Sequence, residues 1–325
     1  GSPLRFEDAT GVAGVGGTRA WSTGVSVVDL NADGLLDLYV SNAGNLDGDD
    51  KQNELFIIEG VGADGLPRCS EQADAYGLAD EGYTTHAAFF DYDRDGDLDA
   101  YLLNNSFRPV SSFGLRNIRN VRDDLGGDKL MRNDSGPDGP RFTDVSEEAG
   151  VYGSEIAFGL GVTVGDVDDD GWTDMYISND FFERDYLYLN NQDGTFREVL
   201  DEAMPLLSLS SMGADMADLT GDGRPEIYVT DMLPEDDRRL KLTSAYEGYN
   251  LYQAKVANDY HHQVMRNTLQ RSNGDGTFSE VGQIAGVSAT DWSWGALFAD
   301  LDSDGFKDLY VANGVYRDVT AQDYI

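Results

Sequence analysis

One short motif occurs five times along the chain and constrains the fold more than any other feature. Every copy begins with Asp and has Asp and Gly at its fifth and sixth positions. The ninth position is Asp in four copies and Glu in one, the eleventh is always Tyr, and the fourteenth is Asn or, once, Asp. Self-similarity of this kind is the signature of a repeat protein. The copies span residues 29–42, 91–104, 166–179, 218–231 and 300–313.

The residues around each motif predict β-strands. A short apolar stretch precedes the motif, and β-branched and aromatic residues alternate in its second half, as in 174–178. A third apolar stretch often follows, and a fourth comes after a glycine turn. Each unit is therefore predicted to be an antiparallel meander of four strands, A to D. The predicted third strands are 54–58, 129–131, 185–189 and 262–265, and the predicted fourth strands are 141–144, 195–198 and 277–280.

Repeated four-stranded units of this size predict an all-β fold, a β-propeller of four-stranded antiparallel blades with a short helical insertion. A flat sheet of about twenty strands would leave open edges and curl, and radial closure avoids both. We therefore expect a single propeller domain over residues 1–325. Its predicted repeat units are about 5–60, 61–133, 134–190, 191–270 and 271–325, with insertions at about 105–127 and 232–262.

The two ends of the chain are expected to belong to incomplete blades. Residues 5–9 have the pattern of a fourth strand without the three strands that should precede it. The fifth unit, from Trp294, supplies two strands, and no third strand is obvious in 315–325. The N-terminal strand is therefore a candidate to close the last blade.

The acidic half of each motif has the pattern of a calcium loop. Oxygen-bearing side chains occupy positions 1, 3, 5 and 9, and glycine at position 6 permits the positive φ of a tight turn. Position 7 can offer its backbone carbonyl. About five structural Ca²⁺ ions are therefore predicted. Their predicted ligands are Asp29, Asn31, Asp33, Leu35 and Asp37; Asp91, Asp93, Asp95, Asp97 and Asp99; Asp166, Asp168, Asp170, Trp172 and Asp174; Asp218, Thr220, Asp222, Arg224 and Glu226; and Asp300, Asp302, Asp304, Phe306 and Asp308.

Other interpretations of the loops fit less well. An EF-hand would place a bidentate Glu at position 12, where these loops have an apolar residue, and helices rather than strands would flank it. Zinc or copper favours His and Cys, but the chain has three His and one Cys, Cys69. Magnesium prefers to keep several waters. The remaining alternative, a hydrogen-bonded Asp turn without metal, leaves several carboxylates to repel one another.

The overall charge excludes some partners. The chain has 60 acidic and 23 basic side chains, for a net charge of −37. Five Ca²⁺ ions would change this to −37 + 10 = −27. A phosphate backbone would be repelled at long range, so nucleic acid is not expected as a partner. No apolar run approaches the ~18–20 residues of a membrane span.

The motifs resemble the FG-GAP/VCBS repeats of integrin-α-like propellers, over about residues 5–315. The chain is most similar to bacterial surface proteins of the cartilage-acidic-protein type. This resemblance implies a calcium-loaded propeller, extracellular or on the cell surface, used for adhesion or complex assembly, with lipid anchoring of the full-length protein as one option. It also implies seven blades, five of them visible here and the others in missing chain. The segments that carry the resemblance are 141–151, 186–196 and 291–305.

Two groups of residues are candidates for binding a partner. The long insertions carry basic and aromatic side chains, which either form a partner surface or pair with the protein's own acids. Aromatic residues eight positions before the motifs either ring a sugar-binding channel or pack between blades. The candidate partner or ligand residues are Trp21, His86, Arg116, Arg119, Tyr249, Trp292 and Trp294.

The predicted function is that of a non-enzymatic module that binds a protein or a cell-surface glycan, as part of a longer protein or surface complex. No serine nucleophile elbow, phosphate loop or His–His–carboxylate cluster is present in the sequence. The first alternative is a lectin-like propeller that uses Trp21, Trp292 and Trp294. The second is a polysaccharide lyase or hydrolase, for which His261 and His262 beside Tyr260 are the available acid–base groups.

Overall fold

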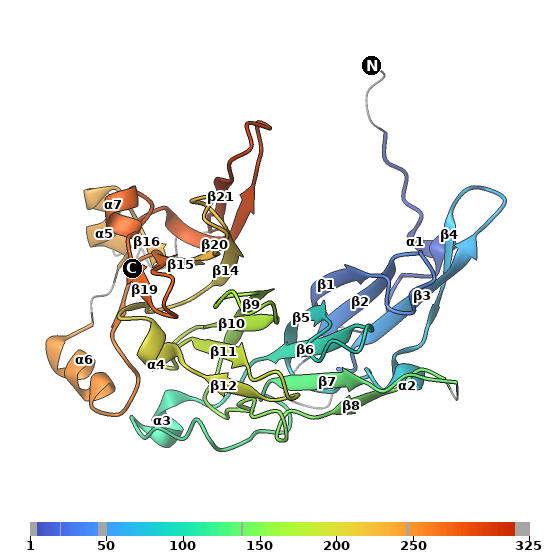
Figure 1. The fold of residues 1–325 in the computed structure, drawn as a ribbon, viewed down its shortest axis with the longest axis horizontal. Coiled ribbons are helices and arrows are strands. Elements are labelled where there is room, and N and C mark those ends of the chain that lie inside the picture. Colours follow the sequence, from blue (N-terminus) through green and yellow to red (C-terminus); the bar gives the residue numbers. More distant parts are fainter. Residues whose placement is uncertain (1–4, 20, 45–50, 138, 245–246, 316–325) are drawn as a thin grey trace.

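The computed structural model describes residues 5–19, 21–44, 51–137, 139–244 and 247–315. It confirms an all-β propeller: antiparallel sheets follow one another along an arc, with the first and last sheets at its two ends (Figure 1). In four sheets the strands are hydrogen-bonded in chain order, so each is a meander whose first strand lies on the inside of the arc. We call these sheets blades 1 to 4 and the last one blade 5.

The strand bounds follow the repeat. Blade 1 has β1 (Ser22–Val28), β2 (Asp37–Asn42), β3 (Glu54–Val61) and β4 (Pro67–Glu71); blade 2 has β5 (Thr84–Phe90), β6 (Asp99–Asn104), β7 (Lys129–Asn133) and β8 (Phe142–Asp144). Blade 3 has β9 (Gly159–Gly165), β10 (Asp174–Asn179), β11 (Tyr186–Asn190) and β12 (Phe196–Glu198); blade 4 has β14 (Gly213–Ala217), β15 (Glu226–Thr230), β18 (Thr268–Ser272) and β19 (Phe278–Glu280).

Blade 5 has a different composition in the described residues. Its strands β20 (Asp291–Ala299) and β21 (Asp308–Asn313) are the A and B strands of the fifth repeat. The short strand β16 (Met232–Leu233), from the second insertion, pairs with the start of β20. Residues 316–325, where a third strand was sought, lie outside the described residues.

Two strand predictions are wrong. Residues 262–265 are not the third strand of blade 4, because Gln263 and Val264 form β17 and pair in parallel with β13 (Leu207–Ser208). The third strand is β18, which pairs with the motif strand β15. Residues 5–9 are not in a strand, and they do not close blade 5.

Short helices occupy the connections and the insertions. Four of them follow an outer strand or its equivalent: α1 (Thr10–Ala13), α2 (Ala73–Tyr76), α4 (Leu200–Ala203) and α7 (Gly282–Ala285). The first insertion contains α3 (Val110–Phe113), and the second contains α5 (Asp237–Thr243) and α6 (Tyr249–Val256), which confirms a helical insertion. Asp236 caps α5 by accepting the Arg239 N–H at 2.8 Å. Among the described residues, no helix has the length and apolarity needed to cross a bilayer.

The motif tyrosine forms the contact between consecutive blades. Tyr39 packs edge-to-face on Phe89 of the next blade with ring centroids 5.4 Å apart, and Tyr228 packs on Phe298 at 6.2 Å. The inner strands also bond directly, since Ser26 Oγ donates to the Ala87 carbonyl at 2.6 Å. Burial of these tyrosines therefore helps to hold one blade against the next.

Candidate cation-binding loops and an aromatic pocket

The acidic loops lie where the predicted topology requires, at the turn from strand A to strand B. In blade 3 the loop runs from the end of β9 to the start of β10. The opposite ends of the same strands carry the insertions, because the chain leaves strand B away from the loop. The five loops cover residues 29–37, 91–99, 166–174, 218–226 and 300–308.

The first Asp of each loop holds the turn together from inside. In blade 3, Asp166 Oδ1 accepts the Asp170 N–H at 3.1 Å and Asp166 Oδ2 accepts the Gly171 N–H at 2.8 Å. Gly171 has φ = 84°, a conformation that L side chains rarely adopt, which explains glycine at this position. The same bond to the glycine N–H is made by Asp29, Asp91, Asp218 and Asp300.

The acidic residue at position 9 is buried in four of the loops. Asp37, Asp99, Asp174 and Glu226 have at most 2% of their surface exposed. Each accepts the N–H of the second loop residue; in blade 3, Asp174 Oδ2 accepts from Val167 at 2.7 Å. Burial raises the pKa of Asp99 and of Asp174 to about 7, despite these hydrogen bonds.

The carboxylates converge as a hard-cation site requires. In blades 2, 3 and 5 three carboxylates of each loop offer oxygens within 4.8 Å of one another. Among the described residues, three buried acceptors in the loops, Asp91 Oδ1, Asp97 Oδ1 and Glu226 Oε1, have no hydrogen-bond partner. Converging, partly orphaned oxygens without nitrogen or sulfur donors fit Ca²⁺. The three clusters are Asp91–Asp93–Asp99, Asp166–Asp168–Asp174 and Asp300–Asp302–Asp304.

The loops of blades 1 and 4 have fewer carboxylates. Asn31 replaces an acid in blade 1, and its amide donates to Asp33 Oδ2 at 3.1 Å. Thr220 takes this position in blade 4, where Arg224 Nη1 lies 3.9 Å from Asp222 Oδ2. Each of these two loops lacks one negative charge, and the loop of blade 4 also has a guanidinium nearby. We therefore expect both loops to bind a cation more weakly than the other three.

The basic candidates of the insertions differ in environment. Arg119 is buried and ion-paired with Glu183, whose side chain is fully buried, so it joins the first insertion to blade 3. Arg116 is exposed. Tyr249, at the start of α6, has 74% of its surface exposed. Arg119 therefore has a structural role, whereas Arg116 and Tyr249 remain accessible.

The aromatic candidates do not form one site. Trp21 precedes β1, whereas Trp292 and Trp294 lie in β20, and these strands stand at opposite ends of the arc (Figure 1). Trp21 is 63% and Trp294 48% exposed. His86 is half-buried in β5, and burial lowers its pKa. The histidines of the second insertion are bonded to the protein itself: His261 Nε2 lies 2.7 Å from the Met204 carbonyl oxygen, and His262 Nδ1 lies 2.7 Å from the Tyr252 hydroxyl.

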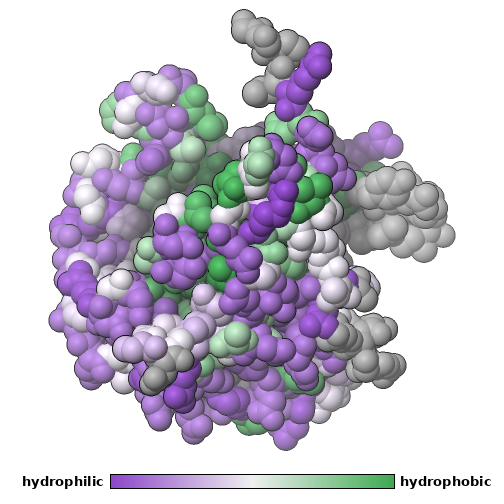
Figure 2. Space-filling view, turned by 90° about the vertical axis from the view of Figure 1, so that its right-hand side faces the viewer, coloured by the Kyte–Doolittle hydropathy of each residue, from purple (hydrophilic) through white to green (hydrophobic). Residues whose placement is uncertain are grey.

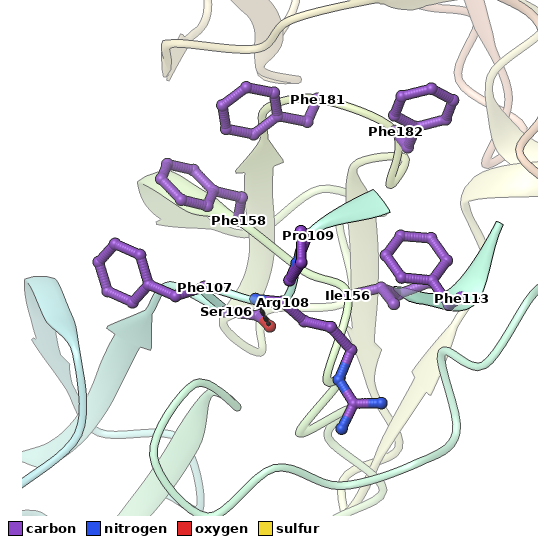
Figure 3. A pocket seen from close by; sticks show the side chains of 9 residues that line it. All are labelled: Ser106, Phe107, Arg108, Pro109, Phe113, Ile156, Phe158, Phe181 and Phe182. Atoms are coloured by element: carbon purple, nitrogen blue, oxygen red, sulfur yellow. Dashed lines mark hydrogen bonds between the residues drawn. The ribbon is translucent and has the colours of Figure 1, made fainter. Parts of the chain in front are cut away.

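An aromatic pocket that the sequence analysis missed lies between blades 2 and 3, at the ends of the strands opposite the loops (Figure 3). Its volume is about 280 Å³. Phe158 joins two other phenylalanines of its lining, with edge-to-face contacts to Phe181 at 4.9 Å and to Phe107 at 6.2 Å. The lining residues are Ser106, Phe107, Arg108, Pro109, Phe113, Ile156, Phe158, Phe181 and Phe182.

The pocket keeps large apolar side chains accessible. Phe181 is 56% exposed and has φ = 67°, a strained conformation for a bulky residue, and Phe107 is 44% exposed. Arg108 at the rim is ion-paired with Glu155 at 2.7 Å, so its charge is neutralised. A signal was present in the sequence, because Phe107 and Phe181 both follow the Asn that ends a motif strand by two or three residues.

Four-stranded blades in an arc, each with an acidic loop at the same corner, define a class: a repeat β-propeller with candidate cation sites. More particularly, its repeats are FG-GAP-like over part of the chain. Residues 166–229 and 256–311 match the family model described as FG-GAP-like repeat. These ranges include the loops of blades 3, 4 and 5.

Comparison with solved structures gives a more distant similarity. One similar chain belongs to a study of the recognition of non-reducing terminal N-acetylglucosamine by a lectin of Agrocybe aegerita. It is 15% identical, with a TM-score of 0.43 over 88% of this chain. The matched region spans 59% of that chain. No curated protein matches the sequence.

Proposed function

We propose that this chain is a calcium-stabilised β-propeller that acts as an extracellular interaction module. The observation that carries the proposal is the repeated loop geometry. The first Asp bonds the glycine N–H in the first turn of every blade, and three carboxylates converge there in blades 2, 3 and 5. The FG-GAP propeller supports an interaction role for the fold. Calcium would neutralise the carboxylates that otherwise repel one another inside each loop.

The expected contribution of calcium to the free energy of unfolding is large enough for a structural role. Sites with a Kd of about 10⁻⁴ M, which is common in extracellular modules, would each contribute roughly 1.5–2 kcal/mol at millimolar Ca²⁺. Three such sites, in blades 2, 3 and 5, would already approach the ~5–15 kcal/mol stability of a typical domain, and weaker sites in blades 1 and 4 would add to it. Sites of this affinity would fill only where calcium is millimolar, so the proposal includes a location outside the cytoplasm.

The aromatic pocket is the surface that we propose for the partner. Phe107 and Phe181 expose contact area at the strand ends away from the loops, and Ile156 and Phe113 form the buried floor. Few polar atoms point into the pocket, because Arg108 is paired with Glu155. A lining of this kind suits an apolar or aromatic side chain of a protein partner better than a sugar, which needs several hydrogen bonds.

Selection from a phage-displayed peptide library tests this proposal. Peptides are selected on the wild-type chain in millimolar Ca²⁺ and counter-selected on the double variant Phe107→Ser, Phe181→Ser. Ile284→Ser is the matched control, because Ile284 is 92% exposed on α7 and does not line the pocket. Peptides with an apolar anchor that bind the wild type and the control, but not the double variant, support the proposal. Failure to select any such peptide contradicts it.

A glycan-binding propeller is the second candidate, and the exposed indoles of Trp21 and Trp294 favour it. Since these residues are far apart along the arc, each would form a separate site. Binding to a glycan array that is lost in Trp294→Ala and retained in Trp21→Ala would assign the site to blade 5. We expect no catalytic turnover, and a reducing-sugar assay on acidic polysaccharides tests that expectation.

A further inference from the structure

A buried hydrogen bond joins blade 3 to the acidic loop of blade 2. Asn190, the last residue of β11, is 5% exposed, and its Nδ2 donates to the carbonyl oxygen of Tyr92 at 2.7 Å. Tyr92 is the second residue of the loop of blade 2, and its own side chain is 2% exposed. The bond therefore crosses from one blade to the next inside the protein.

Both ends of this bond lead to a loop carboxylate. In blade 3, the backbone N–H of Asn190 donates to Asp174 Oδ1 at 2.8 Å. In blade 2, the backbone N–H of Tyr92 donates to Asp99 Oδ2 at 3.2 Å. Asp99 and Asp174 are the ninth residues of their loops, and each belongs to a cluster of three converging carboxylates. Three successive hydrogen bonds therefore connect the two clusters.

The turn after β11 also bonds the loop of its own blade. Gln192 donates its backbone N–H to Asn190 Oδ1 at 2.8 Å, and its Nε2 donates to Asp170 Oδ2 at 2.8 Å. Asp170 is the fifth residue of the loop and one of the predicted calcium ligands. Residues 190–192 thus contact two carboxylates of the loop of blade 3 as well as the loop of blade 2.

The same two loops meet a second time at the surface. The guanidinium carbon of Arg94 lies 4.6 Å from the centroid of the Trp172 ring, which is a cation–π contact. Arg94 has φ = 62°, an uncommon conformation for a long side chain, and from there it reaches the seventh residue of the next loop. The other four loops have shorter residues at the position of Arg94, namely Ala32, Asp169, Gly221 and Ser303.

These contacts are specific to blades 2 and 3. Asn133 is the equivalent of Asn190 in blade 2, but its Nδ2 donates to the Leu98 carbonyl oxygen of its own blade, at 3.1 Å. The equivalent residues in blades 1 and 4 are Ile58 and Ser272, which have no amide group. Across the part of the chain that the structure describes, no other two neighbouring loops share a hydrogen bond or a cation–π contact.

Apolar packing makes the connection rigid. The ring of Tyr92 packs on that of Phe196 in β12, with centroids 5.9 Å apart. Both rings belong to one core cluster that also contains Met175 and Ile177 of β10. Because close-packed interiors transmit strain, a displacement of the loop of blade 2 would also be felt at the loop of blade 3.

We propose that the cation sites of blades 2 and 3 bind cooperatively, and that Asn190 and the Arg94–Trp172 contact are the positioning residues that couple them. The inference rests on the proposed function, in which these loops bind calcium. In a loop without a cation the carboxylates repel one another. A cation at one loop would fix its ninth residue, and the shared contacts would then hold the other loop in place, so that the second cation has fewer groups to order.

The charge of the whole chain provides a second, non-specific coupling. The net charge is −37, and Figure 2 shows hydrophilic residues over most of the side on which blade 1 lies in Figure 1. A cation at any loop therefore reduces the repulsion at every other loop. Salt separates the two effects, because the Debye length is about 3 Å at 1 M ionic strength and buried contacts are screened much less.

A Ca²⁺ titration followed by hydrogen exchange and mass spectrometry reads each loop separately, and about 1 M KCl suppresses the non-specific coupling. Asp93→Asn weakens the site of blade 2. It should raise the Ca²⁺ concentration at which residues 166–174 become protected by about fivefold or more. Asp302→Asn, in the loop of blade 5, should leave this midpoint unchanged, because blade 4 lies between blades 3 and 5.

The double variant Arg94→Ala, Asn190→Ser removes both contacts. It introduces residues that the chain already has at the equivalent positions of blades 1 and 4. In this background Asp93→Asn should shift the midpoint of 166–174 by about twofold or less. Asn133→Ser is the matched control, because it removes only a bond within blade 2 and should keep the full shift. Arg94→Ala alone, which changes an exposed side chain, should also reduce the shift, so the test does not depend on a buried substitution.

The outcomes distinguish this inference from the proposed function. An equal shift with and without the two contacts would overturn coupling through them, and no shift in the wild-type background would overturn coupling altogether. In both cases the loops would still bind calcium. Loops without any Ca²⁺-dependent protection would instead contradict the proposed function, and the inference with it.

Discussion

Asp174 Oδ1 accepts the backbone N–H of Asn190 at 2.8 Å, so the last carboxylate of a cation loop also bonds the far end of strand β11. Its other oxygen accepts from Val167 inside the loop. Asp99 makes the same pair of bonds, to Asn133 in β7 and to Tyr92. A cation bound at these carboxylates would therefore act on the blade as well as on the turn, which couples binding to stability.

Replacement of Asp168 by Ala should have opposite effects with and without calcium. Asp168 lies within 4.8 Å of two other carboxylates, and burial and then the charges of Asp170 and Asp166 raise its pKa. In Ca²⁺ the variant should lose the contribution of one site, roughly 1.5–2 kcal/mol. In chelator it should be as stable as the wild type or more stable, because repulsion is relieved. Equal destabilisation in both denaturant titrations would contradict the prediction.

Replacement of Asp174 by Ala should destabilise the chain in both conditions. The buried N–H groups of Val167 and Asn190 lose their acceptor, and each unsatisfied group costs about 1–3 kcal/mol. Urea unfolding in chelator measures this cost directly, with Asp168→Ala as the matched loop variant. A variant as stable as the wild type in chelator would show that these two bonds do not hold the blade.

Without calcium, the free energy of unfolding should fall as the pH rises from about 4 to about 7. Burial raises the pKa of Asp99 and Asp174 to about 7 in the folded state, from 3.8. The folded chain therefore binds more protons than the unfolded chain across this range, and deprotonation favours unfolding. Asp128 and Asp185, buried beside motif tyrosines, contribute in the same direction.

Calcium should reduce this pH dependence, because a bound cation stabilises the deprotonated loop carboxylates while Asp128 and Asp185 titrate as before. Parallel melts from pH 4.5 to 8 in Ca²⁺ and in chelator check the prediction. The calcium-induced increase in melting temperature should be largest at pH 8. An increase that is independent of pH would show that the raised carboxyl pKa values are not linked to binding.

Loss of either partner in the Arg119–Glu183 pair should destabilise the chain by about 3–5 kcal/mol, because an unpaired charge would remain buried. Arg116→Ala is the matched control in the same insertion, since Arg116 is exposed. Thermal unfolding of Arg119→Ala, Glu183→Ala and the double variant measures two quantities. The single variants give the cost of one buried charge without its partner, and the double variant gives the net contribution of the pair. A double variant as stable as the wild type, with both single variants destabilised, would identify the pair as replaceable.

The repeat predicted most of the fold because its chemistry is local. A glycine with positive φ and a preceding Asp define the turn, and the alternation after it defines the motif strand, as in β10. The distance between successive motifs leaves room for four strands, which predicted the four-stranded blades. The third strand of blade 4 was misplaced because two apolar stretches follow the insertion. Only the register opposite Tyr228 selects 268–272 over 262–265.

The partner surface could not be predicted in the same way, because it depends on which blades become neighbours. Phe107 and Phe181 are 74 residues apart and meet through Phe158 only when blades 2 and 3 pack together. Conversely, Trp21 and Trp292 both stand eight residues before their motifs, but the strands beside them lie at opposite ends of the arc. Arg119 looks like an exposed base in the sequence, and only its pairing with Glu183 shows that it is structural.

Thermal unfolding of the chain in 2 mM Ca²⁺ and in chelator tests the central claim, that cations in the acidic loops stabilise the blades. Three sites of about 1.5–2 kcal/mol each, in blades 2, 3 and 5, with smaller contributions from blades 1 and 4, should raise the melting temperature by roughly 10 °C for a chain of this size. Mg²⁺ at the same concentration should give a much smaller increase. An unchanged melting temperature in calcium and in chelator would contradict the account.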